Sequence, residues 1–247
     1  MADSDQGHVA VGFPKGSLGE YALVCGDPAR AERISRRLKN VEEISRRRGR
    51  LAFAGELDGV RVGVASHGVG CAEAAIVFER MFRSGVKTII RVGTAGSLSP
   101  TIKEGDVVIA TGAVREDGVT PQLVPISFPA VANHNVTAAL ERAAADAKVN
   151  YATGIVVTIG AFFPGLVELS KDIFAKAGAC ACEMECSALF TLASIRGARA
   201  GAILAIDGSA LNVDVETYNP ERDVVREGVE RAIGVSLEAL RFLIRNQ

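Results

Sequence analysis

The stretch TIIRVGTAG at residues 88–96 shows the pattern that decides the fold. Its first five residues are β-branched or apolar apart from Arg91, which is typical of a strand covered on both faces. Gly93, Thr94 and Gly96 follow directly and predict that the strand ends in a turn. Similar apolar runs recur on either side of this stretch and alternate with amphipathic helical patterns. This alternation predicts an α/β fold with a largely parallel or mixed sheet.

The same pattern predicts the other elements of the chain. The predicted strands are residues 21–25, 60–66, 88–92, 107–111, 155–159 and 200–206. The predicted helices are residues 29–39, 71–83, 131–147, 166–177, 187–196 and 221–245. We find no internal repeat and no linker rich in proline, glycine or serine, so we expect a single domain over residues 1–247.

The composition argues against several classes of function. Apolar residues make up 48% of the 247 residues, enough for a sizeable core, and no unbroken apolar stretch is long enough to span a bilayer. The 28 basic residues nearly balance the 29 acidic ones, so we expect no binding to nucleic acid or to a membrane. Residues 1–7 are polar and unlike a secretory signal, and we expect a cytoplasmic protein.

The five cysteines are scattered and odd in number, which favours free thiols over a disulfide framework. Cys180, Cys182 and Cys186 lie close together in sequence, but no histidine lies near them to complete a tetrahedral metal site. We therefore expect no metal ion and interpret these side chains as small buried apolar groups.

Two segments at the ends of predicted strands have the composition of an anion site. Residues 26–30 (GDPAR) combine a glycine, a helix start and a guanidinium, and we expect an exposed backbone N–H there to favour a phosphate. Residues 91–96 (RVGTAG) add a guanidinium, a hydroxyl and a glycine-flanked backbone. Either segment alone could equally be an ordinary helix start or turn.

Taken in order with their surroundings, these segments resemble the nucleoside phosphorylase family of the hexameric type, which includes uridine phosphorylases and trimer-of-dimers purine nucleoside phosphorylases. The matching pieces run from His8 to the final helix: His8, GDP at 26–28 with Arg30, Arg48 before ELDG at 56–59, SHGVG at 66–70, RVGT at 91–94, FPAV at 128–131, FPG at 163–165 and EME at 183–185. The family implies a three-layer α/β/α fold with a central mixed, partly barrel-like sheet.

The resemblance also implies a phosphate site. Gly26, Arg30, Arg91 and Thr94 would hold inorganic phosphate, and Arg48 would reach it from the neighbouring subunit. Several guanidiniums suit a doubly charged anion with three free oxygens. His8 would cross the same dimer interface to the ribose 5′-hydroxyl in a homo-oligomer, expected to be a hexamer built as a trimer of dimers. Phosphate would be a co-substrate, and no cofactor is expected.

For the sugar and the base, the family assigns residues after two further strands. Glu185 would accept hydrogen bonds from the ribose hydroxyls, Met184 would pack under the sugar, and Glu183 is a further nucleoside-binding candidate. Phe162 offers a stacking surface for a base. Arg46, Arg47 and Arg50, which flank Arg48, are interpreted as a solvated patch.

The choice of base depends on two further places. Uridine phosphorylases of this family read the pyrimidine with a Gln and an Arg, where this chain has Leu166 and Glu168. Asp207 ends an apolar strand at the place of the catalytic aspartate of purine-specific members, although an acid there could also be a simple cap. Burial would raise its proton affinity and let it donate to N7. Residues 209–220 contain no basic helper and are closer to inosine- and guanosine-preferring apicomplexan enzymes.

The function predicted on this basis is that of a purine-nucleoside phosphorylase, a pentosyltransferase of purine salvage. It would convert inosine or guanosine and phosphate to ribose 1-phosphate and the free base, with weak turnover of adenosine. Three alternatives stay open: a uridine phosphorylase, a nucleosidase that hydrolyses methylthioadenosine-type nucleosides, and a non-catalytic nucleoside-binding protein.

Overall fold

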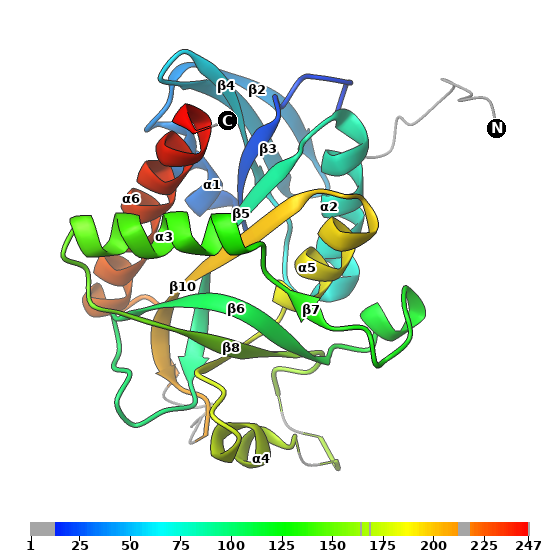
Figure 1. Ribbon diagram of the computed structural model, residues 1–247, viewed down its shortest axis with the longest axis vertical. Helices are drawn as coiled ribbons and strands as arrows, with labels where there is room; N and C mark the ends of the chain where they lie inside the picture. The colour runs from blue at the N-terminus through cyan, green and yellow to red at the C-terminus, as the bar shows by residue number, and fades with distance from the viewer. Residues whose placement is uncertain (1–12, 164, 168, 212–217, 247) are drawn as a thin grey trace.

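The computed structural model describes residues 13–163, 165–167, 169–211 and 218–246, which form one mixed sheet and its covering helices (Figure 1). The strands are β1 (Tyr21–Cys25), β2 (Lys39–Arg47), β3 (Arg50–Leu57), β4 (Val60–Ser66), β5 (Thr88–Ser97), β6 (Val107–Glu116), β7 (Ala130–Val131), β8 (Tyr151–Ile159), β9 (Ala181–Glu183) and β10 (Arg199–Ser209). The helices are α1 (Pro28–Ser35), α2 (Cys71–Ser84), the short 3-10 turn η1 (Thr120–Gln122), α3 (His134–Asp146), α4 (Lys171–Lys176), α5 (Cys186–Ile195) and α6 (Asp223–Arg245).

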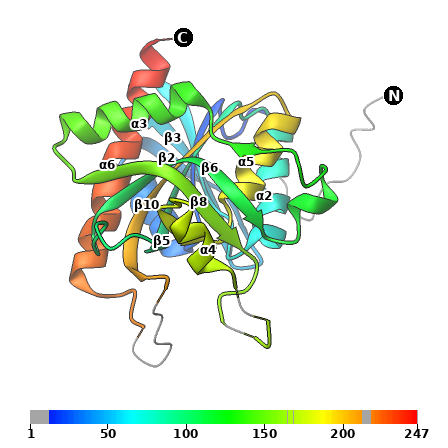
Figure 2. The same cartoon turned by 60° about the horizontal axis from the view of Figure 1, so that its bottom comes forward.

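The sheet closes on itself over part of its width. Strand β5 pairs with β10, β10 with β6, β6 with β8, β8 with β9, and β9 again with β5, which makes a closed ring (Figure 2). The other side of β5 pairs in parallel with β1, and β4, β3 and β2 continue from there as an open sheet. Parallel and antiparallel pairs are mixed, so the predicted mixed, partly barrel-like sheet is confirmed.

Helices cover both faces of this sheet, as the predicted three-layer fold requires (Figure 1). One apolar core joins the sheet to α1, α3 and α6 through fully buried side chains such as Ile34, Leu140 and Leu240. A second core lies under α2 and α5 and includes Phe78 and Phe190. Apolar strands buried on both faces need such covering layers to remove their side chains from water.

Several element boundaries differ from the sequence prediction. The strand expected at 88–92 continues to Ser97, because the backbone of the GTAG segment pairs with β10 instead of turning. The helix expected from residue 131 begins at His134, since Val131 pairs with β6 and Asn133 caps the helix by accepting the N–H of Val136. The helices expected at 29–39 and 166–177 are shorter, at Pro28–Ser35 and Lys171–Lys176.

The hairpin of β2 and β3 was not predicted. Strand β2 has the sequence KNVEEISRR and is largely exposed, so it lacks the alternation of a half-buried strand. It is held by antiparallel pairing with β3, which is buried. Among the described residues, no helix is both long and apolar enough to cross a membrane.

Candidate functional site

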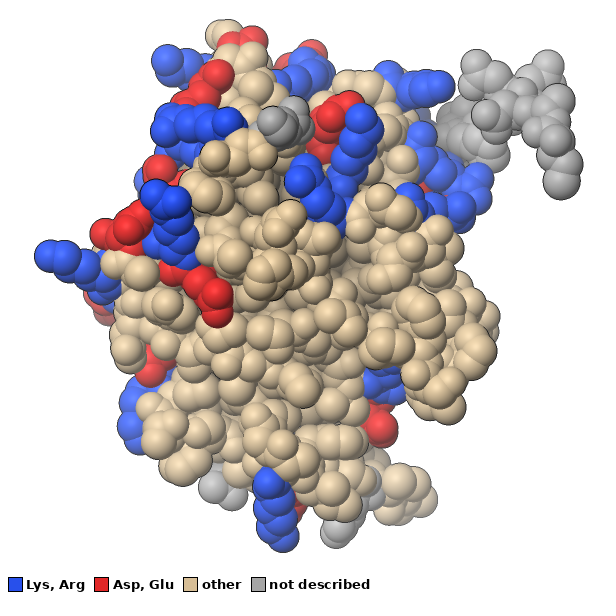
Figure 3. All heavy atoms as spheres, in the orientation of Figure 1, with Lys and Arg blue, Asp and Glu red and all other residues tan. Residues whose placement is uncertain are grey.

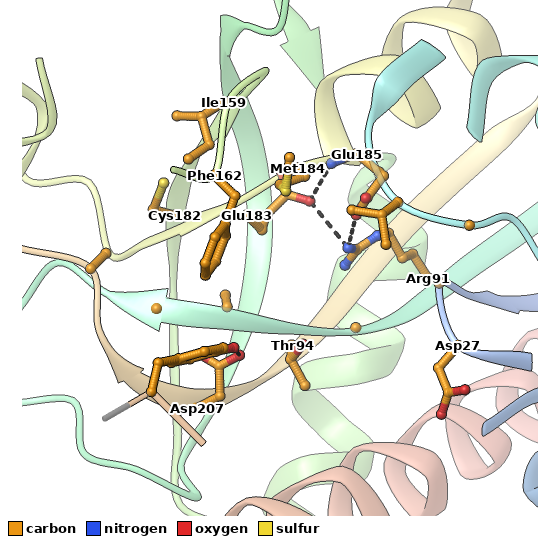
Figure 4. Close-up of a pocket in the computed structure, with 18 of the residues that line it drawn as sticks. Asp27, Arg91, Thr94, Ile159, Phe162, Cys182, Glu183, Met184, Glu185 and Asp207 are labelled. Carbon is orange, nitrogen blue, oxygen red and sulfur yellow. Dashed lines mark hydrogen bonds and ion pairs between the residues drawn. The ribbon is translucent and has the colours of Figure 1, made fainter. Parts of the chain in front are cut away.

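A pocket of about 530 Å³ lies where β1, β5, β9 and β10 approach one another (Figure 4). The site residues predicted from the sequence that line it are Gly26, Arg30, Arg91, Thr94, Phe162, Glu183, Met184, Glu185 and Asp207. They come from segments far apart in the chain, and the parallel strands bring them to one edge of the sheet, the usual place for a ligand in an α/β fold.

Two predicted residues are not brought into this pocket. Arg48 is exposed at the turn between β2 and β3, with a φ of 52°, and does not line the pocket. His8 lies outside the described residues. At the places that read a pyrimidine in uridine phosphorylases, Leu166 is fully exposed, and Glu168 lies outside the described residues.

One end of the pocket carries two arginines with unused donors. The Nη1 of Arg30 donates to the carbonyl oxygen of Val92 at 3.2 Å, whereas its Nε is buried without a partner among the described residues. The Nε and Nη1 of Arg91 are likewise buried without a hydrogen-bond partner there. Buried polar groups rarely stay unpaired, so these donors indicate a place that suits an anion.

The start of α1 differs from the sequence prediction. Asp27 caps this helix by accepting the N–H groups of Ala29 at 2.8 Å and Arg30 at 3.0 Å. These two N–H groups are therefore already used and do not point to a bound anion. The anion-binding character of the segment comes instead from the Arg30 side chain and from Gly26, whose missing side chain lets the backbone approach Gly68.

Gly93 makes room for the guanidinium of Arg91. A Cβ atom at position 93 would lie 1.8 Å from Nη1 of Arg91 and 2.8 Å from a methyl group of Leu204. Arg91 has little freedom to move away, because it is only 4% exposed and forms ion pairs with Glu185 and with Glu183 at 3.4 Å. This glycine within β5 thus sets the position of the arginine.

The two glutamates of the EME segment have different surroundings. Glu183 accepts hydrogen bonds from the hydroxyl of Thr158 and from the backbone N–H groups of Glu185 and Cys186, so it holds the start of α5. Glu185 accepts the backbone N–H of Gly70 as well as the Arg91 guanidinium.

The charges in this region set the ionisation of these groups. Burial is the largest single influence on Glu185 and opposes its ionisation. The charge of Arg91 and smaller contributions, which include hydrogen bonds from Gly70 and Arg91, together outweigh burial and lower the pKa of Glu185. For Glu183 the effect of burial exceeds the opposing effect of Arg91, and the pKa is raised. Burial and then Arg91 lower the pKa of His67 to about 3, so its ring is neutral, with Nδ1–H donating to the carbonyl oxygen of Gly68 at 2.9 Å.

Asp207 lies at the other end of the pocket, on an irregularity of β10. The register of β10 against β5 shifts between Ile206 and Gly208, which leaves Asp207 unpaired and re-aims its side chain. Figure 4 shows Asp207 and Phe162 on the side of the pocket away from Arg91 and Glu185. Burial is the largest influence on the Asp207 carboxyl and raises its pKa, against lowering by hydrogen bonds from Tyr218 and Thr94 and by the charge of Arg30.

Several site residues were missed by the sequence analysis. Tyr218 donates a hydrogen bond to Oδ2 of Asp207 at 2.8 Å and lines the pocket, as does Lys171. Arg222 donates to the backbone carbonyl oxygen of Asp207 at 2.9 Å, so a basic residue does lie beside the acid, just beyond the segment that was searched for one. Tyr218, Lys171 and Arg222 do not lie at the end of a predicted strand, which is the feature by which the sequence analysis selected candidate site residues.

Arg50 was wrongly interpreted as part of a solvated patch. Its side chain is only 13% exposed, and Nη1 lies 3.0 Å from Oε1 of Glu73, a pocket-lining residue. Gly68 makes this arrangement possible, since its φ is +76° and a Cβ there would lie 1.9 Å from the Glu73 carboxylate. Arg46 and Arg47 are exposed, as predicted.

The cysteines form no metal site in the part of the chain that the structure describes, where no cluster of potential ligands is present. All five are free, and all but Cys180 are buried. Burial raises the pKa of the Cys182 thiol to about 12, which keeps it protonated.

Comparison with known proteins agrees with the fold. The family model described as the phosphorylase superfamily matches residues 20–241. A uridine phosphorylase of Treponema pallidum is 36% identical, over 95% of this chain and 93% of the relative. A purine nucleoside phosphorylase of Plasmodium vivax is 34% identical, over 94% of each chain. The chain belongs to the phosphorylase superfamily, in its nucleoside phosphorylase family.

A solved structure supports the same assignment. The crystal structure of purine nucleoside phosphorylase from Toxoplasma gondii in complex with immucillin-H superimposes with a TM-score of 0.92 at 32% identity. The alignment covers 98% of this chain and 99% of that one. The relatives thus include both purine and uridine enzymes, so family membership leaves the base to be decided by the pocket.

Proposed function

We propose that the protein is a purine-nucleoside phosphorylase that prefers inosine and guanosine. The observation that carries this proposal is the buried Asp207 at the end of the pocket opposite Arg91, with Phe162 beside it. A carboxyl with a raised pKa can carry a proton to N7 of a purine, an atom that a pyrimidine lacks. Leu166, which is exposed and apolar, offers nothing to read a pyrimidine.

In the proposed reaction, Gly26, Arg30, Arg91 and Thr94 hold phosphate below the sugar. A phosphate oxygen forms a bond to C1′ while the bond from C1′ to N9 of the purine breaks. Asp207 gives its proton to N7, so that the base leaves neutral and the products are ribose 1-phosphate and hypoxanthine or guanine. The reaction needs phosphate as a co-substrate and no further cofactor.

Glu185 would stabilise the positive charge that develops on the ribosyl group and accept the ribose hydroxyls. A carboxylate can accept about four hydrogen bonds, and the contacts from Arg91 and Gly70 leave part of this capacity for a sugar. Met184, in the same pocket, would pack under the ring. Glu183 would act through the start of α5, because its oxygens are occupied by backbone donors and Thr158.

A phosphate-dependence assay over inosine, guanosine, adenosine and uridine tests this function, with release of the free base as the readout. We expect inosine and guanosine to be cleaved only when phosphate is present, and adenosine to be cleaved slowly. Faster turnover of uridine would assign a uridine phosphorylase instead. Cleavage without phosphate would assign a nucleosidase, and no cleavage at all would assign a binding protein.

We propose further that the active form is a cytoplasmic homo-oligomer, a hexamer built as a trimer of dimers. The face seen in Figure 3 supports burial against a second copy, since charged side chains gather near α6 and the β2–β4 end and are sparse in its middle. A groove of about 520 Å³ on β6 and residues 126–131 is bordered by the exposed apolar side chains of Ile126, Val131 and Ile155.

Co-expression of Arg48→Ala and Asp207→Asn chains tests whether subunits share sites. Each variant alone should be nearly inactive, because one lacks the arginine for its neighbour's phosphate and the other lacks the acid. In a mixed dimer one site has both groups, so we expect activity in the mixture well above the sum of the two variants. Activity no higher than that sum would show that Arg48 serves no neighbouring site.

Gly93→Ala should weaken phosphate binding. The added methyl group displaces the Arg91 guanidinium, and the loss of one charge-assisted hydrogen bond, worth about 1.5–3 kcal/mol, should raise the KM for phosphate by on the order of tenfold or more. The matched control is Gly234→Ala on the exposed side of α6, where a Cβ meets nothing within 4 Å. It should leave this KM unchanged, and an equal KM in both variants would contradict the role given to Gly93.

A further inference from the structure

The contact between Tyr218 and Asp207 has no assigned part in the reaction described above. The phenol oxygen lies 2.8 Å from Oδ2 of Asp207 and donates to it. Asp207 is 7% exposed, so its carboxyl has little water to replace such a donor. A hydrogen bond to a carboxylate that is this deeply buried is stronger than one in water, because the local dielectric constant is lower.

The ring of Tyr218 is held by a second contact. Its centroid lies 5.5 Å from that of Phe162 at an interplanar angle of 53°, and Phe162 in turn packs edge-on against Phe163 at 5.2 Å. Tyr218 and Phe162 both line the pocket. One tyrosine therefore connects the aromatic wall of the pocket to the carboxyl at its end.

This hydrogen bond changes what the carboxyl can do. While the phenol donates to Oδ2, the proton of the neutral acid is carried by Oδ1, so the bond selects the oxygen that can release a proton. After release, the same bond stabilises the carboxylate that is left behind. Burial and the charge of Asp207 raise the pKa of Tyr218, which keeps the phenol protonated and able to donate at neutral pH.

Tyr218 lowers the pKa of Asp207 more than any other group does, and the other groups near the carboxyl contribute less. They are Thr94 of β5, which also hydrogen-bonds the carboxyl; Arg30 of α1, which acts through its charge; Cys182 of β9, a protonated thiol; Lys171 of α4, close to Cys182; and Arg222, which donates to the backbone carbonyl oxygen of Asp207 and pairs with Glu104 at 2.7 Å. Arg222 thus fixes the backbone at Asp207, whereas Tyr218 fixes the side chain.

We propose that Tyr218 is a positioning residue for the general acid: it orients the Asp207 carboxyl through Oδ2, directs the transferable proton to Oδ1 and stabilises the carboxylate formed when the purine leaves. This inference rests on the proposed function, since it assigns Tyr218 a part only if Asp207 is the acid. The residue sits in the loop after β10 and acts through Asp207 without taking a proton itself.

The test is the variant Tyr218→Phe, which keeps the ring and removes only the hydroxyl. We expect kcat for inosine to fall about tenfold, as for loss of one hydrogen bond to a charged group, with the KM for phosphate unchanged. Loss of the donor raises the pKa of Asp207. Because the acid works in its protonated form, the alkaline limb of the profile of kcat/KM against pH should move to higher pH. An unchanged kcat with an unmoved limb would overturn the proposal.

A nucleoside that needs no acid separates this role from a structural one. 7-Methylguanosine carries a methyl group and a positive charge at its imidazole ring, so its base leaves without a proton from the enzyme. Tyr218→Phe should cleave it at the wild-type rate, as should the exposed control Tyr151→Phe, which should also keep full activity on inosine. An equal loss on both nucleosides would show a merely structural role.

The double variant Tyr218→Phe with Asp207→Asn distinguishes failure of this inference from failure of the proposed function. If Tyr218 acts through Asp207, its loss should add nothing to the loss of the acid. Additive effects would overturn the inference while leaving Asp207 as the acid. Full inosine turnover by Asp207→Asn alone would instead remove the proposed function on which the inference rests.

Discussion

Asp207→Asn is expected to lower kcat for inosine phosphorolysis by roughly 10²–10⁴-fold, the usual contribution of a positioned general acid. Asparagine keeps the size of the side chain and can still accept the Tyr218 hydrogen bond, but it has no proton to give to N7. The purine must then leave as an anion, which is a much poorer leaving group. Binding of inosine and phosphate should change little, so the effect should appear in kcat.

The pH dependence of activity provides a second test of Asp207 as the general acid. Burial raises the pKa of Asp207, so the wild-type enzyme keeps the protonated form to higher pH than an exposed aspartate would. Activity on inosine should fall as pH rises through this pKa, and Asp207→Asn should lack that limb. Cleavage of 7-methylguanosine by Asp207→Asn should stay near the wild-type rate. A large loss on that nucleoside too would show that Asp207 supports the fold and not the proton transfer.

Arg91→Met is expected to have two large effects, on stability and on phosphate binding. The guanidinium is buried between Glu183 and Glu185, and removal of one partner from a buried ion pair typically costs about 3–5 kcal/mol. The free energy of unfolding, measured with denaturant, should fall by about that amount. The KM for phosphate should rise by at least tenfold, because Arg91 is one of the two arginines within this pocket that are proposed to hold the anion.

The loss of stability should depend on pH in a defined direction. Arg91 lowers the pKa of Glu185, so this pair contributes stability above the unfolded pKa of a glutamate, and the contribution is lost as pH falls through the folded value. In Arg91→Met the two buried carboxyls lose the cation that favours their charged form, so they take up protons at higher pH than in the wild type. The difference in stability between variant and wild type should therefore be largest near neutral pH and shrink as the pH is lowered.

A second variant separates the two effects of Arg91. Arg91→Met combined with Glu185→Gln removes one of the uncompensated charges and should recover part of the stability, but it should not recover phosphate binding. If the single variant kept the wild-type KM for phosphate, Arg91 would not be an anion ligand. If it kept the wild-type stability, the ion pair with Glu185 would contribute nothing to the fold.

The sequence predicted well those features that depend on neighbouring residues. Strands β1 and β4 are apolar throughout or nearly so and bounded by turn residues, and their predicted limits agree with the structure. Strand β2 and the short β7 were missed because their pairing partners, not their own residues, hold them in the sheet. In the same way, residues 93–97 remain extended because β10 lies beside them.

The site was predictable where chemistry-bearing residues lie near the end of a predicted strand. Gly26, Arg30, Arg91 and Asp207 all have that signal, and the structure places them around one pocket. Tyr218 gave no such signal, since it lies in a polar segment eleven residues after Asp207. Arg50 could not be distinguished in the sequence from the neighbouring exposed arginines, and only its contact with Glu73 in the structure identified it.

The sequence by itself determined the α/β class and the residues that carry the proposed chemistry, because local hydrophobic patterns and the order of motifs are properties of the chain alone. Only the tertiary structure decided that Arg91 is held between two glutamates and that Tyr218 reaches Asp207. These features depend on contacts between residues distant in sequence. Such contacts are fixed by how whole elements pack, and no local pattern encodes them.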